Sequence, residues 1–163
     1  MMGIWGLVAL MVIESPRFAY GAPIPVLYTC DGQDRSPALT IVGVPEAAQS
    51  LVLLLEDPDA PVGTFTHWVV YDMAPDRASL PEGVSREPET LGFKQGQTSF
   101  GSVGYGGPCP PQSHGPHRYF FRLYALDLPS LDLPPGAPAD VVRESLEGHV
   151  LEEAEWMGTY ERR

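Results

Sequence analysis

The sequence is poor in positive charge: it has a single lysine, Lys94, and 10 basic residues against 21 acidic ones. The formal net charge is −11 at pH 7 over 163 residues. Nucleic-acid-binding proteins neutralise phosphates with clustered Lys and Arg side chains. No basic stripe of this kind runs along the chain, and we therefore expect no nucleic-acid partner.

Long apolar segments are also scarce. The apolar stretch Met1–Ile13 falls short of the roughly 20 residues that a membrane-spanning helix needs. It contains no Lys or Arg and so lacks the charged start of a signal peptide. We interpret residues 1–11 as an N-terminal extension, with Met11 as an alternative start and a weak membrane-targeting segment as a further alternative. The expected location is the cytoplasm, and the periplasm or export is the alternative.

Only two cysteines are present, Cys30 and Cys109. They provide neither a disulfide framework nor four thiolate ligands for a metal ion. Two reduced thiols are the favoured interpretation, and one bridge between Cys30 and Cys109 is the alternative.

Long helices are not expected either, because 18 Pro and 17 Gly interrupt the chain. The length suits one domain with a single core, which we place at residues 12–163. Apolar runs bounded by turn residues predict strands. The expected fold class is therefore mainly β, an antiparallel β-sandwich with one or two peripheral helices near the C-terminus. Strands are predicted at Val12–Pro16, Ala38–Val44, Leu51–Glu56, Trp68–Met73 and Arg118–Leu126, with a long connection at Ala74–Pro111.

The C-terminal region carries the clearest helical pattern, because its apolar residues recur every three or four positions. Asp140 suits the N-cap, Gly148 weakens the middle of the helix, and Gly158 suits the C-terminal stop. The apolar stripe consists of Val142, Leu146, Val150, Leu151, Ala154 and Met157.

Polar residues occur where the predicted strands begin or end. Because strand side chains alternate, His117 and Tyr119 share one face of their strand. By the same count, His67 shares a face with Val69 and Tyr71. If these strands are neighbours, the polar groups converge beside aromatic side chains.

Asp57 follows directly on the apolar run Leu51–Leu55 and would join this group. A pocket with His and Tyr donors suits a small anion such as phosphate, held by hydrogen bonds rather than by Lys or Arg. Each residue also has a common structural role. Asp57 and Asp59 suit turn caps, and a lone His or Tyr at a strand end is more often part of the core.

Motifs of catalytic and metal sites are missing. The chain has no Gly-x-Ser-x-Gly elbow and no His-x-His or His-Glu-x-x-His spacing. Hydrolysis with a His–Asp general base remains an alternative, as does an Asp, His, His metal site. A third alternative is a protease or kinase inhibitor that acts through an exposed Pro-rich loop.

Two segments carry motifs in a recognisable order. Asp57–Pro61 is followed by His67-Trp68, and the proline-rich segment Gly107–Tyr119 comes later. Together they resemble the two signatures of the phosphatidylethanolamine-binding protein family, in particular its bacterial and archaeal Raf-kinase-inhibitor-like branch. Weaker likeness extends the resemblance over residues 12–160.

The resemblance implies an antiparallel β-sandwich with an anion pocket, no enzymatic activity, no cofactor and no metal. The implied ligand is a phosphatidylethanolamine headgroup, a phosphomonoester or a phosphorylated partner. Regulation of a protein kinase or protease and a homodimer are associated expectations. The implied pocket residues are Asp57, Asp59, His67, Pro110, Pro111, His117 and Tyr119, with Cys109 near the rim.

Overall fold

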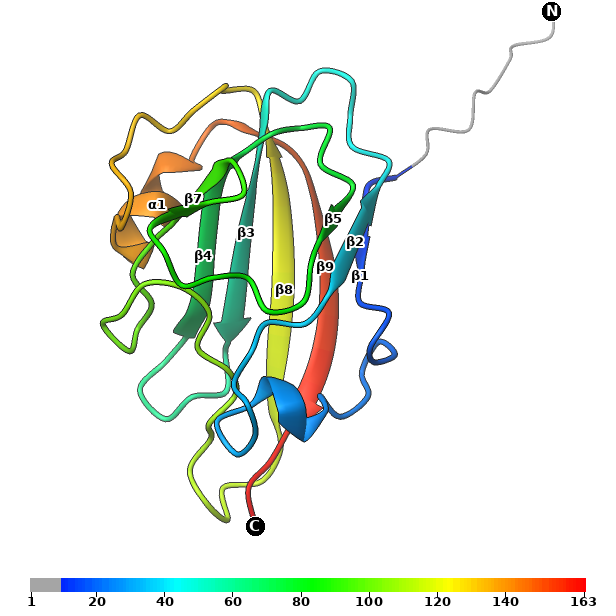
Figure 1. Cartoon of the computed structure of the whole chain (residues 1–163), viewed down its shortest axis with the longest axis vertical. Coiled ribbons are helices and arrows are strands. Elements are labelled where there is room, and N and C mark those ends of the chain that lie inside the picture. Colours follow the sequence, from blue (N-terminus) through cyan, green and yellow to red (C-terminus); the bar gives the residue numbers. More distant parts are fainter. Residues whose placement is uncertain (1–9) are drawn as a thin grey trace, which may run out of the picture.

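The computed structural model describes residues 10–163. Two antiparallel β-sheets pack face to face, and within this range one α-helix, α1 (Ala139–Ser145), lies against the larger sheet (Figure 1). The smaller sheet has the strand order β1-β2-β5, and the larger has the order β6-β7-β4-β3-β8-β9. The predicted mainly β sandwich with a helix near the C-terminus is therefore confirmed. The predicted N-terminal extension lies almost entirely outside the described residues.

All the predicted strands form. β1 covers Val12–Glu14, β2 Leu39–Val42, β3 Ser50–Asp57, β4 Phe65–Met73, β5 Ser79–Leu80, β6 Glu89–Thr90, β7 Phe93–Gln95, β8 His117–Leu126 and β9 Val150–Tyr160. A short 3-10 turn, η1, spans Val26–Tyr28. The predicted long connection contains the three short strands β5, β6 and β7 and is otherwise irregular.

Strand β3 is buried on both faces, which explains why it is an almost unbroken apolar run. Leu51, Leu53 and Leu55 belong to the core between the two sheets. Val52 and Leu54 belong to a second cluster on the opposite face, which α1 covers. β3 is thus a buried central strand, and Asp57 is its last residue.

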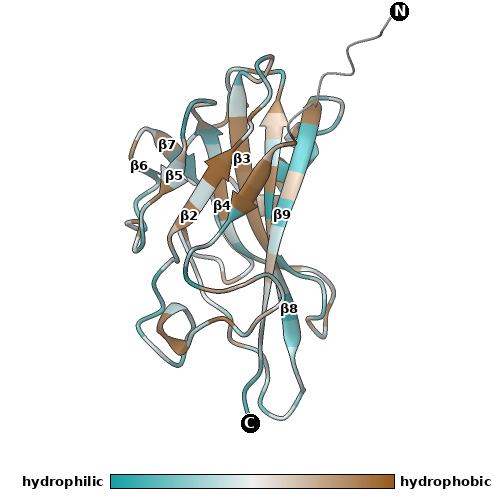
Figure 2. Cartoon of the chain, turned by 90° about the vertical axis from the view of Figure 1, so that its right-hand side faces the viewer, coloured by the Kyte–Doolittle hydropathy of each residue, from teal (hydrophilic) through white to brown (hydrophobic). Residues whose placement is uncertain are grey.

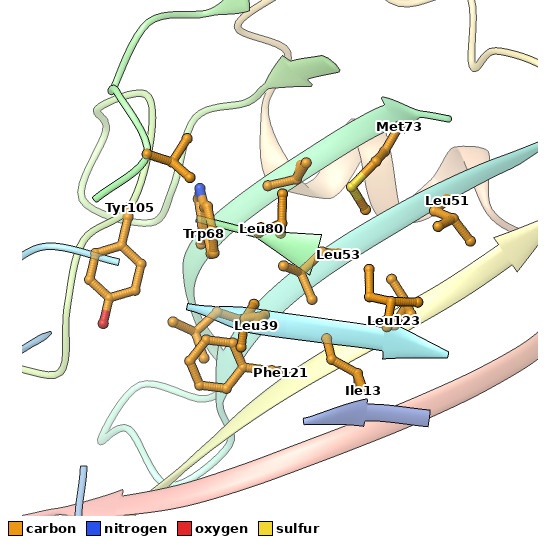
Figure 3. Packing of buried hydrophobic residues seen from close by; sticks show 14 of the residues in the cluster. Ile13, Leu39, Leu51, Leu53, Trp68, Met73, Leu80, Tyr105, Phe121 and Leu123 are labelled. Carbon is orange, nitrogen blue, oxygen red and sulfur yellow. The ribbon is translucent and has the colours of Figure 1, made fainter. Parts of the chain in front are cut away.

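The core between the sheets holds large side chains from both layers. Ile13 and Leu39 of the small sheet face Leu123 and Phe121 of β8 (Figure 3). Trp68 of β4 also belongs to this core. Its indole N–H donates to Gln95 Oε1 at 2.7 Å. The buried polar edge of Trp68 is therefore satisfied.

The predicted C-terminal helix is wrong beyond its first two turns. α1 ends at Ser145, and β9 pairs along the length of β8, from Leu126↔Val150 to His117↔Tyr160. Pairing satisfies the backbone groups of an otherwise open strand edge, and this tertiary effect overrides local helical periodicity. Gly148 adopts φ +79°, which favours glycine and turns the chain between the two elements. The predicted N-cap is also wrong: Pro138 holds that position.

Strand β9 shows why a helical pattern was misleading. In the strand, Ala154 and Trp156 pack against the core, whereas Glu153 and Glu155 are exposed. The resulting banding of hydrophilic and hydrophobic residues is visible along β9 (Figure 2). The apolar residues of this segment therefore fit an alternation of two residues, as in a strand, as well as the helical repeat of 3.6 residues.

None of the helices in the described part of the chain is long and apolar enough to cross a membrane.

Candidate functional site

A cavity of about 250 Å³ opens where β3 ends and where β4 and β8 begin. Its wall is mostly apolar, and neither Lys nor Arg is among the described residues that form it. The wall consists of Asp57, Ala60, Pro61, Val62, Phe65, His67, Phe100, Cys109, Pro110, Pro111, His117 and Tyr119. Six of the seven implied pocket residues therefore lie together, and Asp59 does not.

His67 reaches the cavity because β4 has a bulge. Leu55 pairs with Trp68 and Glu56 pairs with Thr66, so that His67 is the extra residue. A bulge of this kind redirects a side chain without ending the strand. The His67 ring packs edge-on against Tyr119, at 5.3 Å between ring centroids. The prediction that His67 shares a face with Val69 and Tyr71 is therefore wrong, because those two residues face α1.

Asp57 and His117 form a buried pair at the floor of the site. The His117 Nδ1–H donates to Asp57 Oδ2 at 2.6 Å, and the two residues are only 1% and 3% exposed. The other carboxylate oxygen, Asp57 Oδ1, accepts the backbone N–H of Asp59 at 2.8 Å. Both oxygens of Asp57 are therefore occupied by donors, and the carboxylate fixes the ring orientation of His117.

His67 is held by a backbone carbonyl. Its Nδ1–H donates to the carbonyl of Gly106 at 2.7 Å, which leaves Nε2 as the free ring nitrogen. Burial lowers the pKa of His67 below the ordinary histidine value. The neutral ring is therefore favoured in the empty site.

This depressed pKa gives a prediction for stability. Because folded His67 binds protons less readily than unfolded His67, the stability that it contributes is present above pH ~6.5 and is lost as pH falls towards the folded pKa. We expect the free energy of unfolding to fall between pH 7 and pH 5, and to fall less steeply in His67→Gln. Urea denaturation across this range measures the slopes. Equal slopes in the two proteins would contradict the assignment.

The Tyr119 hydroxyl is buried without a hydrogen-bond partner among the described residues. Burial, followed by the nearby Asp57 carboxylate, raises the pKa of Tyr119, so that its hydroxyl keeps its proton at neutral pH. Buried polar groups are nearly always paired, and an unpaired one costs about 1–3 kcal/mol. The Tyr119 hydroxyl is therefore an unpaired donor buried at the cavity wall, beside the Asp57 carboxylate.

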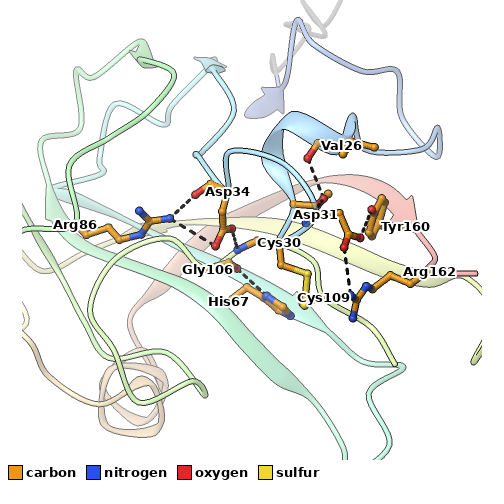
Figure 4. The surroundings of a disulfide bond; sticks show 12 residues. Val26, Cys30, Asp31, Asp34, His67, Arg86, Gly106, Cys109, Tyr160 and Arg162 are labelled. Atoms are coloured by element: carbon orange, nitrogen blue, oxygen red, sulfur yellow. Dashed lines mark hydrogen bonds and ion pairs between the residues drawn. A yellow bond between two sulfur atoms is a disulfide. The ribbon is translucent and has the colours of Figure 1, made fainter. Parts of the chain in front are cut away.

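A disulfide joins the rim of the cavity, formed by Cys109, Pro110 and Pro111, to the segment that follows η1. Cys30 and Cys109 are bridged with 5.4 Å between their Cα atoms, so the prediction of two reduced thiols is wrong (Figure 4). Folding brings the two segments together: Cys30 N–H donates to the carbonyl of Pro108, and Gly107 N–H donates to Asp34. A Cβ at Gly107 would lie 2.3 Å from the carbonyl oxygen of Tyr28, so this close approach requires glycine.

Asp59 lies outside the cavity wall. Its carboxylate accepts two hydrogen bonds from the Arg118 guanidinium at 2.9 and 2.8 Å, and a third from the Arg118 backbone N–H at 2.9 Å. These bonds hold the pKa of Asp59 at about 2, well below the ordinary carboxyl range. The structure thus places Asp59 where it anchors the start of β8.

Beyond the implied residues and Cys109, five further residues form the cavity wall: Ala60, Pro61, Val62, Phe65 and Phe100. Phe65 and Phe100 stack edge-on at 4.7 Å and line the cavity beside His67. His114 contacts His117 directly, with 2.6 Å between ring nitrogens. Phe65 could have been found by strand alternation from His67, but Phe100 lies in an irregular segment without a pattern.

Within residues 10–163, no group of three or more His, Cys, Asp or Glu side chains is arranged to hold a metal ion.

Comparisons with known proteins identify relatives that match nearly the whole chain. A UPF0098 protein of Methanothermobacter thermautotrophicus is 52% identical over 155 residues, which cover 93% of this chain and 99% of that protein. A UPF0098 protein of Aquifex aeolicus is 51% identical over 154 residues, covering 94% and 90%.

Solved structures of similar proteins share the fold of this chain. The phosphatidylethanolamine-binding protein homologue CT736 from Chlamydia trachomatis is 40% identical with a TM-score of 0.85, covering 94% of this chain and 99% of that one. YbcL of E. coli is 30% identical with a TM-score of 0.88, covering 95% and 100%. The carboxypeptidase Y inhibitor in complex with its proteinase shares the fold alone, at 19% identity and a TM-score of 0.56 over 94% and 84%. The family described as phosphatidylethanolamine-binding protein matches residues 14–161, and the chain belongs to that family.

Proposed function

We propose that this protein is a non-enzymatic binding protein whose cavity takes a phosphate-bearing ligand. The ligand is a phosphomonoester, a phospholipid headgroup such as that of phosphatidylethanolamine, or a phosphorylated residue of a protein partner. These ligands share the same chemistry, an anionic oxygen cluster attached to a larger group. The cavity size and its mixed wall suit a ligand of this kind.

The observation that carries the proposal is the unpaired Tyr119 hydroxyl. It lies in the wall of the same cavity as His67 and His117. A ligand oxygen that accepts from Tyr119 removes the cost of a buried unsatisfied donor. The apolar wall around it, with Phe65 and Phe100, suits the uncharged remainder of the ligand.

Among the described residues, the cavity wall contains neither Lys nor Arg, which supports binding of an anion by hydrogen bonds rather than by ion pairs. Both oxygens of the Asp57 carboxylate already accept hydrogen bonds from the protein, and its charge is not neutralised by a lysine or arginine among the described residues of the cavity wall. Protonation of His67 would turn its free Nε2 into a charged donor. Anion binding is therefore coupled to proton uptake, and phosphate affinity should fall as pH rises through the histidine range.

A hydrolase is the alternative, with the Asp57–His117 pair as general base. Such a mechanism requires a nucleophile that the base can activate. Cys109 is the cysteine in the cavity wall, and its sulfur is held in the disulfide. A binding role therefore has the stronger support.

The disulfide also bears on the compartment. Disulfides persist in oxidising compartments and, among intracellular proteins, in those of hyperthermophiles. We therefore propose the periplasm or export for a mesophilic host, and the cytoplasm for a hyperthermophilic one.

Replacing Tyr119 by phenylalanine tests the proposal directly. Because the buried hydroxyl has no partner within residues 10–163, Tyr119→Phe should not lower the free energy of unfolding and should raise it by up to about 1–3 kcal/mol. It should weaken the binding of inorganic phosphate by about threefold to tenfold, measured by calorimetry. Tyr105→Phe is the matched control.

The Tyr105 hydroxyl donates to the Tyr28 carbonyl at 2.6 Å and is fully buried away from the cavity wall. Its loss should lower stability by about 1 kcal/mol without changing phosphate affinity. The opposite pattern, in which Tyr119→Phe lowers stability and leaves affinity unchanged, would remove Tyr119 from the site.

A further inference from the structure

A chain of three side chains leads from the buried floor of the cavity to the surface. Asp57 Oδ2 accepts from His117 Nδ1 at 2.6 Å, and His117 Nε2 lies 2.6 Å from His114 Nδ1. Asp57 and His117 are buried, whereas His114 is exposed. Both ring nitrogens of His117 are therefore occupied within the protein.

The hydrogen bonds fix the position of each proton in the neutral state. The Asp57 carboxylate only accepts, so the proton of neutral His117 is on Nδ1. His117 Nε2 then carries a lone pair, and the contact with His114 needs a proton from His114 Nδ1. Neutral His114 is thus an Nδ1–H tautomer whose outer nitrogen, Nε2, is an acceptor.

Addition of one proton to the two rings converts His114 Nε2 from a hydrogen-bond acceptor into a donor. If the proton is on His117 Nε2, His114 Nδ1 must accept, and the His114 proton moves to its Nε2. If the proton is on His114, both of its nitrogens carry hydrogen. In either arrangement His114 Nε2 becomes a donor, although the charge remains shared with the buried pair.

Other ionisable groups lie near the two rings. Two neighbouring carboxylates are compensated: Asp59 by Arg118, and Asp31 by Arg162 at 3.2 Å. The pKa values of Tyr119 and Tyr160 are raised, chiefly by burial, so both are uncharged at neutral pH. The pKa of His67 is lowered by burial. Asp57 is thus the uncompensated charge beside His117.

His114 lies next to the mouth of the cavity. Its backbone N–H donates to the carbonyl of Pro111, which lines the cavity, and Ser113 N–H donates to the carbonyl of Arg162. Ser113 adopts φ +61°, so the turn that carries His114 is held in a left-handed conformation. His114 is therefore joined to two residues of the cavity wall, to Pro111 through its backbone and to His117 through its ring.

We propose that His114 is a further anion-binding residue, which presents the proton of the Asp57–His117 pair to the bound phosphate group through its Nε2. This inference rests on the proposed function and refines it. The buried pair supplies the charge and holds the tautomer, and His114 makes the contact. His117 acts on the ligand through His114 while the contact between the two rings is maintained.

Histidine ¹⁵N NMR tests the relay without any ligand. At pH 8.5 we expect His114 to carry its proton on Nδ1 and a lone pair on Nε2, and His117 to carry its proton on Nδ1. Acidification should protonate His114 Nε2 while His117 Nδ1 remains protonated throughout. A His114 ring with its proton on Nε2 at pH 8.5 would overturn the relay.

Addition of inorganic phosphate to the full chain at pH 6.5 tests the contact. We expect the His114 Nε2 resonance to shift towards the protonated form with the same saturation curve as Tyr119. His114→Phe keeps the ring over His117 but removes the donor, and should weaken phosphate binding about tenfold. His149→Phe is the matched control, because His149 is also exposed and also pairs with an aspartate, Asp127 at 2.8 Å, outside the cavity.

The outcomes separate this inference from the proposed function. Saturable phosphate binding that leaves His114 Nε2 unchanged, or equal affinities in His114→Phe and the unchanged protein, would overturn the role of His114 and leave the cavity site intact. Absence of saturable phosphate binding in the unchanged protein would overturn both.

Discussion

The His117→Ala variant is expected to unfold with a free energy about 3 kcal/mol lower than that of the unchanged protein. The substitution leaves the Asp57 carboxylate, which is 3% exposed, without its ring partner in the protein interior. Removal of the hydrogen-bond donor alone costs more than removal of both partners, because the remaining carboxylate charge stays desolvated. Urea denaturation at pH 7 measures the difference.

A double variant separates this effect from the loss of packing. Asp57→Asn combined with His117→Ala removes the stranded charge and should recover about half of the lost stability or more. His149→Ala, which removes an exposed histidine with its own aspartate partner, should change stability by less than about 0.5 kcal/mol. If the double variant is less stable than His117→Ala, the pair does not act as described.

Loss of the disulfide is expected to have the largest effect on stability. The bridge joins residues 79 positions apart, and in the chain-entropy description a loop of that size contributes about 4 kcal/mol. Cys30→Ser with Cys109→Ser should therefore lower the melting temperature substantially. The bridge also holds the rim, since Cys109 precedes Pro110 in the cavity wall, so phosphate affinity should fall as well.

Reduction provides the control for this prediction. A dithiol reductant should destabilise the unchanged protein as much as the two serine substitutions do, and should have no effect on the serine variant. Equal melting temperatures for all four samples would show that the hydrogen bonds between the two segments, such as Cys30 N–H to Pro108, hold the rim without the bridge.

The sandwich could be predicted because its central strands carry strong local patterns. β3, β4 and β8 are apolar runs of strand length bounded by turn residues, and burial on two faces requires such runs. β9 could not be predicted in the same way. Its period of two became evident only through pairing with β8, which is a tertiary contact.

The sequence predicted which residues form the candidate site better than it predicted how they are positioned. His117 and Tyr119 share a face by simple alternation, and the structure places them so. His67 reaches the same cavity only through a bulge, for which the sequence has no clear signal. The pairing of Cys30 with Cys109 depends on long-range packing, and the contact between His114 and His117 depends on the turn at Ser113.

The most direct test of the anion site is an NMR titration of inorganic phosphate into the unchanged protein at pH 6.5. The account predicts saturable shifts centred on Tyr119, His67, His117 and His114, with the remaining shifts confined to the cavity wall. The same titration of Tyr119→Phe should saturate at a higher phosphate concentration. Shifts that do not saturate, or that centre on the exposed arginines instead of the cavity, would contradict the proposal.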